Sequence, residues 1–146
     1  MEIYTIGFTK HSAAGFFGAL KKTGIKRLID VRLNNTSQLA GFAKKNDLEY
    51  FLKELGGIEY IQEPLFAPEP SAFVQFKKKK SMPWNDFENA FLATMKERRI
   101  QDVVPKSLFK EPAVLLCSEE TAEHCHRRLV AEYLKDQWGG VNIIHM

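Results

Sequence analysis

The chain has 146 residues, of which 45% are hydrophobic and 27% are charged. These proportions are typical of one globular domain of ordinary size and exclude a disordered chain. The formal net charge of +3 is too small to indicate nucleic-acid binding by itself, and it suits a small anionic ligand equally well.

The sequence carries no signal for a membrane or for export. No apolar run approaches the roughly 20 residues that a membrane-spanning helix needs. The first residues lack the basic-then-apolar order of a signal peptide. Two cysteines cannot form a disulfide framework. We therefore expect a cytoplasmic protein that does not contact membranes.

Strand and helix patterns alternate along the chain. The first half contains, in order, a strand Glu2–Gly7, a helix from the N-cap Ser12 to Lys22 stopped by Gly24, a strand Lys26–Val31, a polar loop 33–46, a helix closed by Gly56-Gly57, and a strand Ile58–Ile61. The second half contains a helix from about Pro83, a short segment 101–109, a strand Val114–Cys117, a helix from about Glu123 to about Gln137, and a strand Val141–His145.

This alternation predicts the α/β fold class. We expect a single three-layer domain over residues 1–146, with a mostly parallel sheet of about five strands and helices on both faces. Residues 62–82 contain three prolines and no clear periodicity. They are predicted to form an irregular excursion, which is either a flap over the site or a packed surface segment.

Ionisable side chains gather directly after the strand Val114–Cys117. In open α/β sheets, ligands bind at the carboxyl ends of strands, where loops meet helix N-termini. We therefore predict a catalytic group of Cys117 as nucleophile or redox thiol, His126 as acid or base, and Glu119 as an orienting carboxylate. The alternative is a structural corner, in which Cys117 is a buried thiol and the polar groups satisfy one another.

Two arginines are candidate anion binders. Arg32 follows the second strand, and Arg127 lies in the last helix, so either guanidinium could hold a carboxylate or phosphate. Ligand-binding roles are also predicted for three residues at neighbouring strand ends, which are Gly7, Asp30 and Asn34. The alternatives are that Asp30 and Arg32 only order the loop, and that Arg127 pairs with a carboxylate on the helix surface.

Cys125 is expected about one turn into the last helix, where its helical phase favours a core thiol. It could instead pair with Cys117, either in a reversible disulfide or in a metal site with Glu119 and His126. The cysteine spacing matches no standard zinc pattern, so we predict no metal site.

The four lysines Lys77–Lys80 are followed by Trp84, and basic charge beside an aromatic ring can bind nucleic acid. A single run of charge is more often a solvated face. These lysines, with Arg32 and Arg127, define the alternative function of a non-catalytic module that binds nucleic acid or nucleotide.

Several of these motifs together resemble the family called domain of unknown function 488. The resembling segments are Tyr4-Thr5-Ile6-Gly7, Asp30-Val31-Arg32, residues 34–42, Pro64-Leu65-Phe66-Ala67-Pro68, Leu115-Leu116-Cys117-Ser118-Glu119 and Cys125-His126-Arg127. The family commonly has His and Ser after the first motif, where this chain has Phe8 and Thr9. Any role of that His is then absent here or passed to His11.

The resemblance implies a single α/β domain and supports the site, but it implies no particular reaction, cofactor or substrate. The Asp30-Val31-Arg32 strand end also resembles sulfurtransferases of the rhodanese type, but neither cysteine has the arginine six positions later that such a catalytic loop needs. We therefore predict a small enzyme or ligand-processing domain whose pocket binds a small anion, such as a phosphate or a nucleotide.

Overall fold

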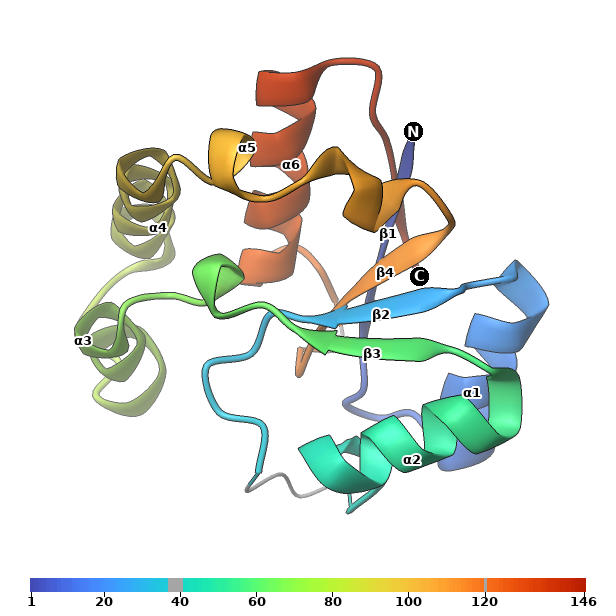
Figure 1. Ribbon diagram of the computed structural model, residues 1–146. Coiled ribbons are helices and arrows are strands. Elements are labelled where there is room, and N and C mark those ends of the chain that lie inside the picture. The colour runs from blue at the N-terminus through green and yellow to red at the C-terminus, as the bar shows by residue number, and fades with distance from the viewer. Residues whose placement is uncertain (37–40, 120) are drawn as a thin grey trace.

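The computed structural model describes residues 1–36, 41–119 and 121–146. Five strands form one sheet in the order β3-β2-β4-β1-β5, and every neighbouring pair is parallel (Figure 1). The strands are β1 (Glu2–Gly7), β2 (Arg27–Asp30), β3 (Glu59–Gln62), β4 (Ala113–Cys117) and β5 (Asn142–His145). The predicted fold class is therefore confirmed.

The helices cover both faces of the sheet (Figure 1). The main helices are α1 (Ala13–Thr23), α2 (Lys45–Gly56), α4 (Trp84–Arg98) and α6 (His126–Trp138), and the short ones are α3 (Pro70–Phe73) and α5 (Ile100–Val103). Single helical turns lie at η1 (Gly41–Ala43), η2 (Pro64–Phe66), η3 (Val74–Lys78) and η4 (Lys106–Phe109). One apolar core joins α1 and α2 to the sheet, and a second core joins α4, α5 and α6 to the opposite face.

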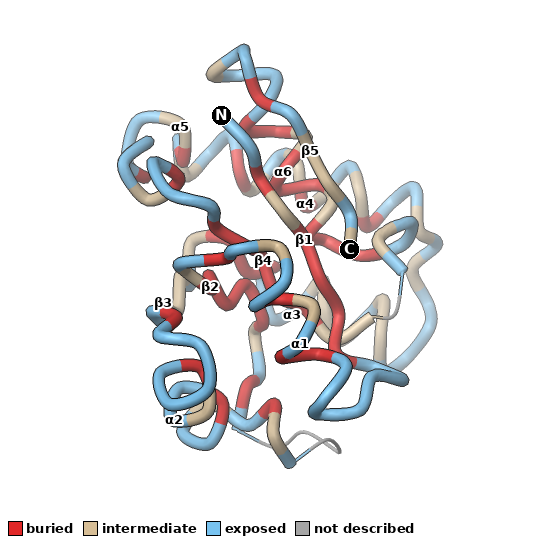
Figure 2. The backbone as a smooth tube through the Cα atoms, turned by 90° about the vertical axis from the view of Figure 1, so that its right-hand side faces the viewer, coloured by how far each residue is buried: buried red, intermediate tan, exposed pale blue. Residues whose placement is uncertain are grey.

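The central strand β4 belongs to both cores. All five of its residues are buried, and the tube in Figure 2 is red along it. Side chains alternate across a strand, so Val114 and Leu116 pack on the α1 face, whereas Leu115 and Cys117 pack on the α6 face. Cys117 is the last residue of β4, which places its thiol beside the first turn of α6.

The predicted end signals of α1 and α2 are present. The Ser12 side chain caps α1 by accepting a hydrogen bond from the Gly15 amide. Gly24 and Gly57 end α1 and α2 in the left-handed conformation that glycine adopts without strain.

Two segments differ from the predictions. The last helix begins at His126 instead of about Glu123, and Cys125 is its N-cap with an extended backbone. The helical pattern predicted too early a start because residues 121–125 form bends and turns instead of helix. One of these turns is closed by a hydrogen bond from the Cys125 amide to the Ala122 carbonyl. Residues 62–82 contain η2, α3 and η3, so they are more regular than their prolines suggest. Flap movement of this stretch stays a prediction.

The connections diverge between β4 and β1. The chain leaves β1 through α1 toward β2, and it leaves β4 through α6 on the opposite face toward β5. A crevice at such a switch point, outside the carboxyl ends of the strands, is the usual ligand site of open α/β sheets. Cys117 pairs in register with Gly7 at this point.

None of the helices among the described residues is both long and apolar enough to cross a membrane.

Gly7 is required by a close backbone approach. A Cβ atom built on Gly7 would lie 1.5 Å from the carbonyl oxygen of Glu119, which crosses the end of β1. We predict that Gly7→Ala lowers the free energy of unfolding by roughly 3 kcal/mol, because backbone on both sides must shift. Urea denaturation followed by circular dichroism measures this change.

Gly18→Ala is the matched control, because Gly18 is exposed in α1 and has open space around its Cα. It should raise the stability by roughly 0.5–1 kcal/mol through helix propensity. Equal stabilities of the two variants would contradict the close approach at Gly7.

Candidate functional site

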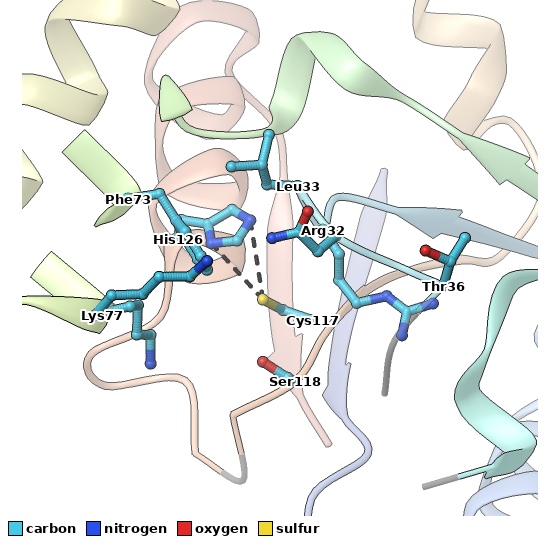
Figure 3. A pocket seen from close by; sticks show the side chains of 10 residues that line it. Arg32, Leu33, Thr36, Phe73, Lys77, Cys117, Ser118 and His126 are labelled. Atoms are coloured by element: carbon cyan, nitrogen blue, oxygen red, sulfur yellow. Dashed lines mark hydrogen bonds between the residues drawn. The ribbon is translucent and has the colours of Figure 1, made fainter. Parts of the chain in front are cut away.

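The thiol of Cys117 is the centre of the site. Its Sγ lies 3.7 Å from Nδ1 and 3.9 Å from Nε2 of His126, the first residue of α6 (Figure 3). Both side chains are buried, with Cys117 5% and His126 6% exposed. The structure therefore brings the predicted nucleophile and the predicted acid or base into contact.

The neutral form of His126 has one favoured tautomer. Its Nε2 lies 2.7 Å from the carbonyl oxygen of Val31. A carbonyl oxygen only accepts hydrogen bonds, so Nε2 carries the hydrogen and donates it. The lone pair is then on Nδ1, the ring nitrogen nearer to Cys117, where it can accept a proton from the thiol.

The surroundings of Cys117 favour its thiolate. A hydrogen bond from the Cys125 thiol, a second from the Ser118 backbone and the charge of Arg127 lower the pKa of Cys117, although burial opposes them. Burial raises the pKa of Cys125 well above its ordinary value. At neutral pH, Cys125 is therefore the protonated donor and Cys117 is the more readily ionised thiol.

Cys117 and His126 line a cavity of about 500 Å³, which we call the Arg32 cavity. Its remaining lining residues are Arg32, Leu33, Asn34, Thr36, Phe73, Lys77, Lys78 and Ser118. In the view of Figure 3, the Cys117 sulfur lies between Arg32 and Lys77. Three of the described lining residues are cationic and none is acidic, and two of the cations pair with carboxylates outside the lining, Arg32 with Asp30 and Lys77 with Glu119.

Asp30 fixes Arg32 at the wall of this cavity. The Arg32 Nε donates to Oδ1 and NH2 donates to Oδ2, both at 2.9 Å, and the Arg32 amide also donates to Oδ1. The Tyr60 hydroxyl donates to Oδ2 at 2.5 Å and Asn35 donates at 3.4 Å. Burial and the bond to Asp30 raise the pKa of Tyr60, which keeps its hydroxyl a donor.

One nitrogen of Arg32 remains without a partner. Within the described part of the chain, Arg32 NH1 is the single buried side-chain nitrogen or oxygen that makes no hydrogen bond. The Arg32 side chain is 3% exposed, and its guanidinium carbon lies 5.5 Å from the centre of the Phe8 ring. Phe8 thus places an aromatic ring against the Arg32 guanidinium. His11 does not line the cavity.

Arg127 was expected either to bind an anion or to form an ion pair on the helix surface, but it lies in the protein interior. Its side chain is fully buried and does not line the Arg32 cavity. NH1 donates to the Glu119 carbonyl at 2.7 Å and contacts Cys125 Sγ at 3.5 Å, while Nε is 3.4 Å from the Thr5 hydroxyl. That hydroxyl is 2.6 Å from His145 Nδ1. Arg127 thus ties β1, the loop after β4 and the start of α6 together.

The other predicted site residues divide between the cavity and its support. Asn34 lines the cavity. Gly7 and Asp30 are not among the lining residues. Gly7 allows the Glu119 backbone to cross close to the end of β1, and Asp30 holds Arg32 by an ion pair. The Glu119 carboxylate is 41% exposed and forms an ion pair with Lys77, outside the cavity lining. Positions 37–40 of the segment that resembles the family lie outside the described residues.

Sequence reasoning missed the lining residues from α3 and η3, which are Phe73, Lys77 and Lys78. The lysines were interpreted as a solvated charge run or as part of a nucleic-acid or nucleotide-binding surface, and the signal that could have linked them to the cavity was their position in the expected flap. Tyr60 was also missed, because the sequence does not show that β3 lies beside β2.

The site can also offer ligands to a metal ion. The Cys117, Cys125 and His126 ligand atoms all lie within 4.8 Å of one another, and all three residues are buried. Glu119, which was included in the metal alternative, is not among them. Both cysteines are free thiols.

The two thiols should differ in reactivity. We predict that iodoacetamide modifies Cys117 in the reduced, chelator-treated protein with a pH midpoint below that of Cys117 in the urea-unfolded chain. Cys125 should stay unmodified until the protein unfolds, because it is buried and its pKa is raised. Peptide mass spectrometry over a pH series measures each thiol separately. Two thiols that both stay inert until unfolding would instead be structural.

Comparison with known proteins agrees with the motifs. No curated protein and no solved structure gave a significant match. The family described as domain of unknown function DUF488 matches residues 12–134, which is most of the chain and includes Arg32, Cys117 and His126. This chain therefore belongs to the DUF488 family.

Proposed function

We propose that this protein is a small enzyme or ligand-processing domain that binds a small anion in the Arg32 cavity and acts on it through Cys117. Suitable ligands carry a phosphate-like or carboxylate group that fits a cavity of about 500 Å³, and a nucleotide is one of them. The proposal assigns binding to Arg32 and Asn34, with Lys77 and Lys78 supplying positive charge.

The observation that carries the proposal is the unpartnered NH1 of Arg32. A buried guanidinium nitrogen without a hydrogen bond costs free energy, because it has lost its water and gained nothing in exchange. An anion in the cavity would accept that hydrogen bond beside Cys117. Such charge-assisted bonds from arginine are among the strong ones in proteins.

Cys117 would be the reacting group because it is the readily ionised thiol at the cavity wall. A thiolate can attack an electrophilic centre of the bound ligand, whose leaving group departs with the bonding electron pair. His126 would take the thiol proton at Nδ1 and return it to the leaving group. Glu119 would act indirectly, since its carboxylate pairs with Lys77 and its carbonyl binds Arg127.

The alternative of a nucleic-acid module has less support. Its basic residues would have to reach a phosphate backbone, but Arg127 is fully buried and Arg32 is 97% buried. Only the lysine run remains at the surface, and Lys77 is occupied by Glu119. Titration with single- and double-stranded oligonucleotides at low salt tests this alternative, because phosphate contacts are strongest there.

Alkylation by a charged and a neutral reagent tests the proposed function. Iodoacetate and iodoacetamide react with a thiolate in the same way, but only iodoacetate carries an anionic group for Arg32. We predict that the ratio of the iodoacetate rate to the iodoacetamide rate at Cys117 is about tenfold higher in the native protein than in the unfolded chain. A tenfold ratio corresponds to about 1.4 kcal/mol, which one charge-assisted hydrogen bond can supply. Inorganic phosphate should lower the iodoacetate rate by competition.

The lysines offer a matched pair of variants. Lys78→Gln, at the cavity, should reduce the iodoacetate preference, whereas Lys96→Gln, in a separate groove between α4 and α6, should not change it. An equal ratio in native and unfolded protein, with no effect of phosphate, would show that no anion site faces Cys117.

A further inference from the structure

We propose that Cys117, Cys125 and His126 bind one thiophilic divalent ion such as Zn²⁺, with a fourth coordination position that opens into the Arg32 cavity. This inference goes beyond the proposed function, which needs Cys117 and Arg32 but no metal. The two share Cys117, but metal binding and anion preference are measured independently, so one can fail without the other.

The spacing of the donor atoms suits a tetrahedral ion. With zinc–sulfur and zinc–nitrogen bonds of about 2.3 and 2.0–2.1 Å, tetrahedral geometry places sulfur and nitrogen about 3.6 Å apart. Cys117 Sγ lies 3.7 Å from His126 Nδ1, and Cys125 Sγ lies within 4.8 Å of Cys117 Sγ and of a His126 ring nitrogen. Cys117 Sγ is also 3.9 Å from Nε2, so an ion bound at Nδ1 also requires the His126 ring or the Cys117 side chain to rotate.

His126 is already oriented as a metal ligand. Histidines that bind metals usually donate their other ring N–H to a carboxylate or backbone carbonyl, which fixes the ring and its tautomer. The bond from His126 Nε2 to the Val31 carbonyl is an interaction of this kind. It leaves the Nδ1 lone pair free to coordinate an ion held between the ring and the two sulfurs.

The backbone positions of the ligands are rigid. Cys117 ends the buried central strand, and Cys125 and His126 are the N-cap and first residue of α6. Two thiolates neutralise a divalent charge, and Arg127 NH1, 3.5 Å from Cys125 Sγ, can donate to a metal-bound thiolate. Cys125 would release its proton to solvent on binding, as thiol ligands do.

Three protein ligands leave one coordination position open, as in catalytic rather than structural zinc sites. Cys117 and His126 both line the Arg32 cavity, so a ligand in the cavity could reach a metal held by them. In the loaded protein, Cys117 would be a metal ligand and no longer a free nucleophile. Zinc should therefore protect both thiols from alkylation.

Cobalt titration of the reduced, metal-free protein tests the inference. One equivalent of Co²⁺ should produce thiolate-to-cobalt charge-transfer bands and the intense visible bands of a tetrahedral ion, and Zn²⁺ should displace it. The same equivalent of Zn²⁺ should suppress iodoacetamide modification of Cys117. The proposal would be overturned if the folded protein gave no such bands and Zn²⁺ did not protect Cys117 from iodoacetamide.

Adjacent histidines provide the matched control. His126→Asn and the nearly isosteric Cys125→Ser should each lose the tetrahedral cobalt bands, whereas His124→Ala should keep them, because His124 is exposed and stacks on Trp84. Circular dichroism checks that each variant is folded. If His126→Asn does not fold, Cys125→Ser decides the test, and unchanged cobalt bands in that variant would overturn the proposal.

Lys78→Gln separates the two proposals. It should weaken the preference for iodoacetate and leave cobalt binding unchanged. A protein that binds cobalt but shows no anion preference would support the metal site and contradict the anion site, and the reverse result would do the opposite.

Discussion

The buried pair of Asp30 and Arg32 is the interaction on which the geometry of the candidate site depends. The Asp30 carboxylate accepts hydrogen bonds from two of the three guanidinium nitrogens of Arg32, and it also accepts hydrogen bonds from Tyr60 and Asn35. The pair is sequestered from water, so loss of either partner would leave an unpaired buried charge, at a cost of about 3–5 kcal/mol. The same fixed geometry leaves NH1 without a hydrogen-bond partner in a residue that lines the cavity. In the proposed function, this nitrogen is the ordered donor for an anion bound beside Cys117.

A second constraint keeps Cys117 beside that donor. The loop after β4 crosses the end of β1 at Gly7, which has no side chain to obstruct it, and Arg127 holds the loop by its Glu119 carbonyl. Arg127 also contacts Cys125, so the position of the second thiol depends on the same buried cation. The two arginines thus have different tasks. Arg32 faces the cavity, whereas Arg127 organises the residues behind it.

The sequence was sufficient to predict the fold class, the strands and the strand end at which Cys117 meets His126, because periodicity and end signals are local. Ser12, Gly24 and Gly57 marked helix ends, and the buried run before Cys117 marked the central strand. The contact between Cys117 and His126 followed from the strand-loop-helix pattern. The role of Arg127 did not, because the pattern placed the helix start too early and gave no sign that a guanidinium would be fully buried.

Strand order and long-range contacts were outside the reach of the sequence. Tyr60 supports Asp30 only because β3 lies beside β2, and Lys77 and Lys78 reach the cavity only because α3 and η3 fold back to it. Cys125 was expected on a helix face, and its position as N-cap brings it near Cys117 and His126. The contacts of Tyr60, Lys77 and Lys78 depend on pairing between segments far apart in the chain, which local patterns do not encode.

The central claim is that Arg32 presents a free guanidinium nitrogen to an anion beside Cys117. Nitrogen-15 NMR of the arginine side chains during a phosphate titration tests it most directly. The account predicts a saturable shift of the Arg32 guanidinium signals, while the buried Arg127 and the exposed Arg99 stay unchanged. Absence of any shift at Arg32, or small unsaturated shifts at exposed arginines alone, would contradict it.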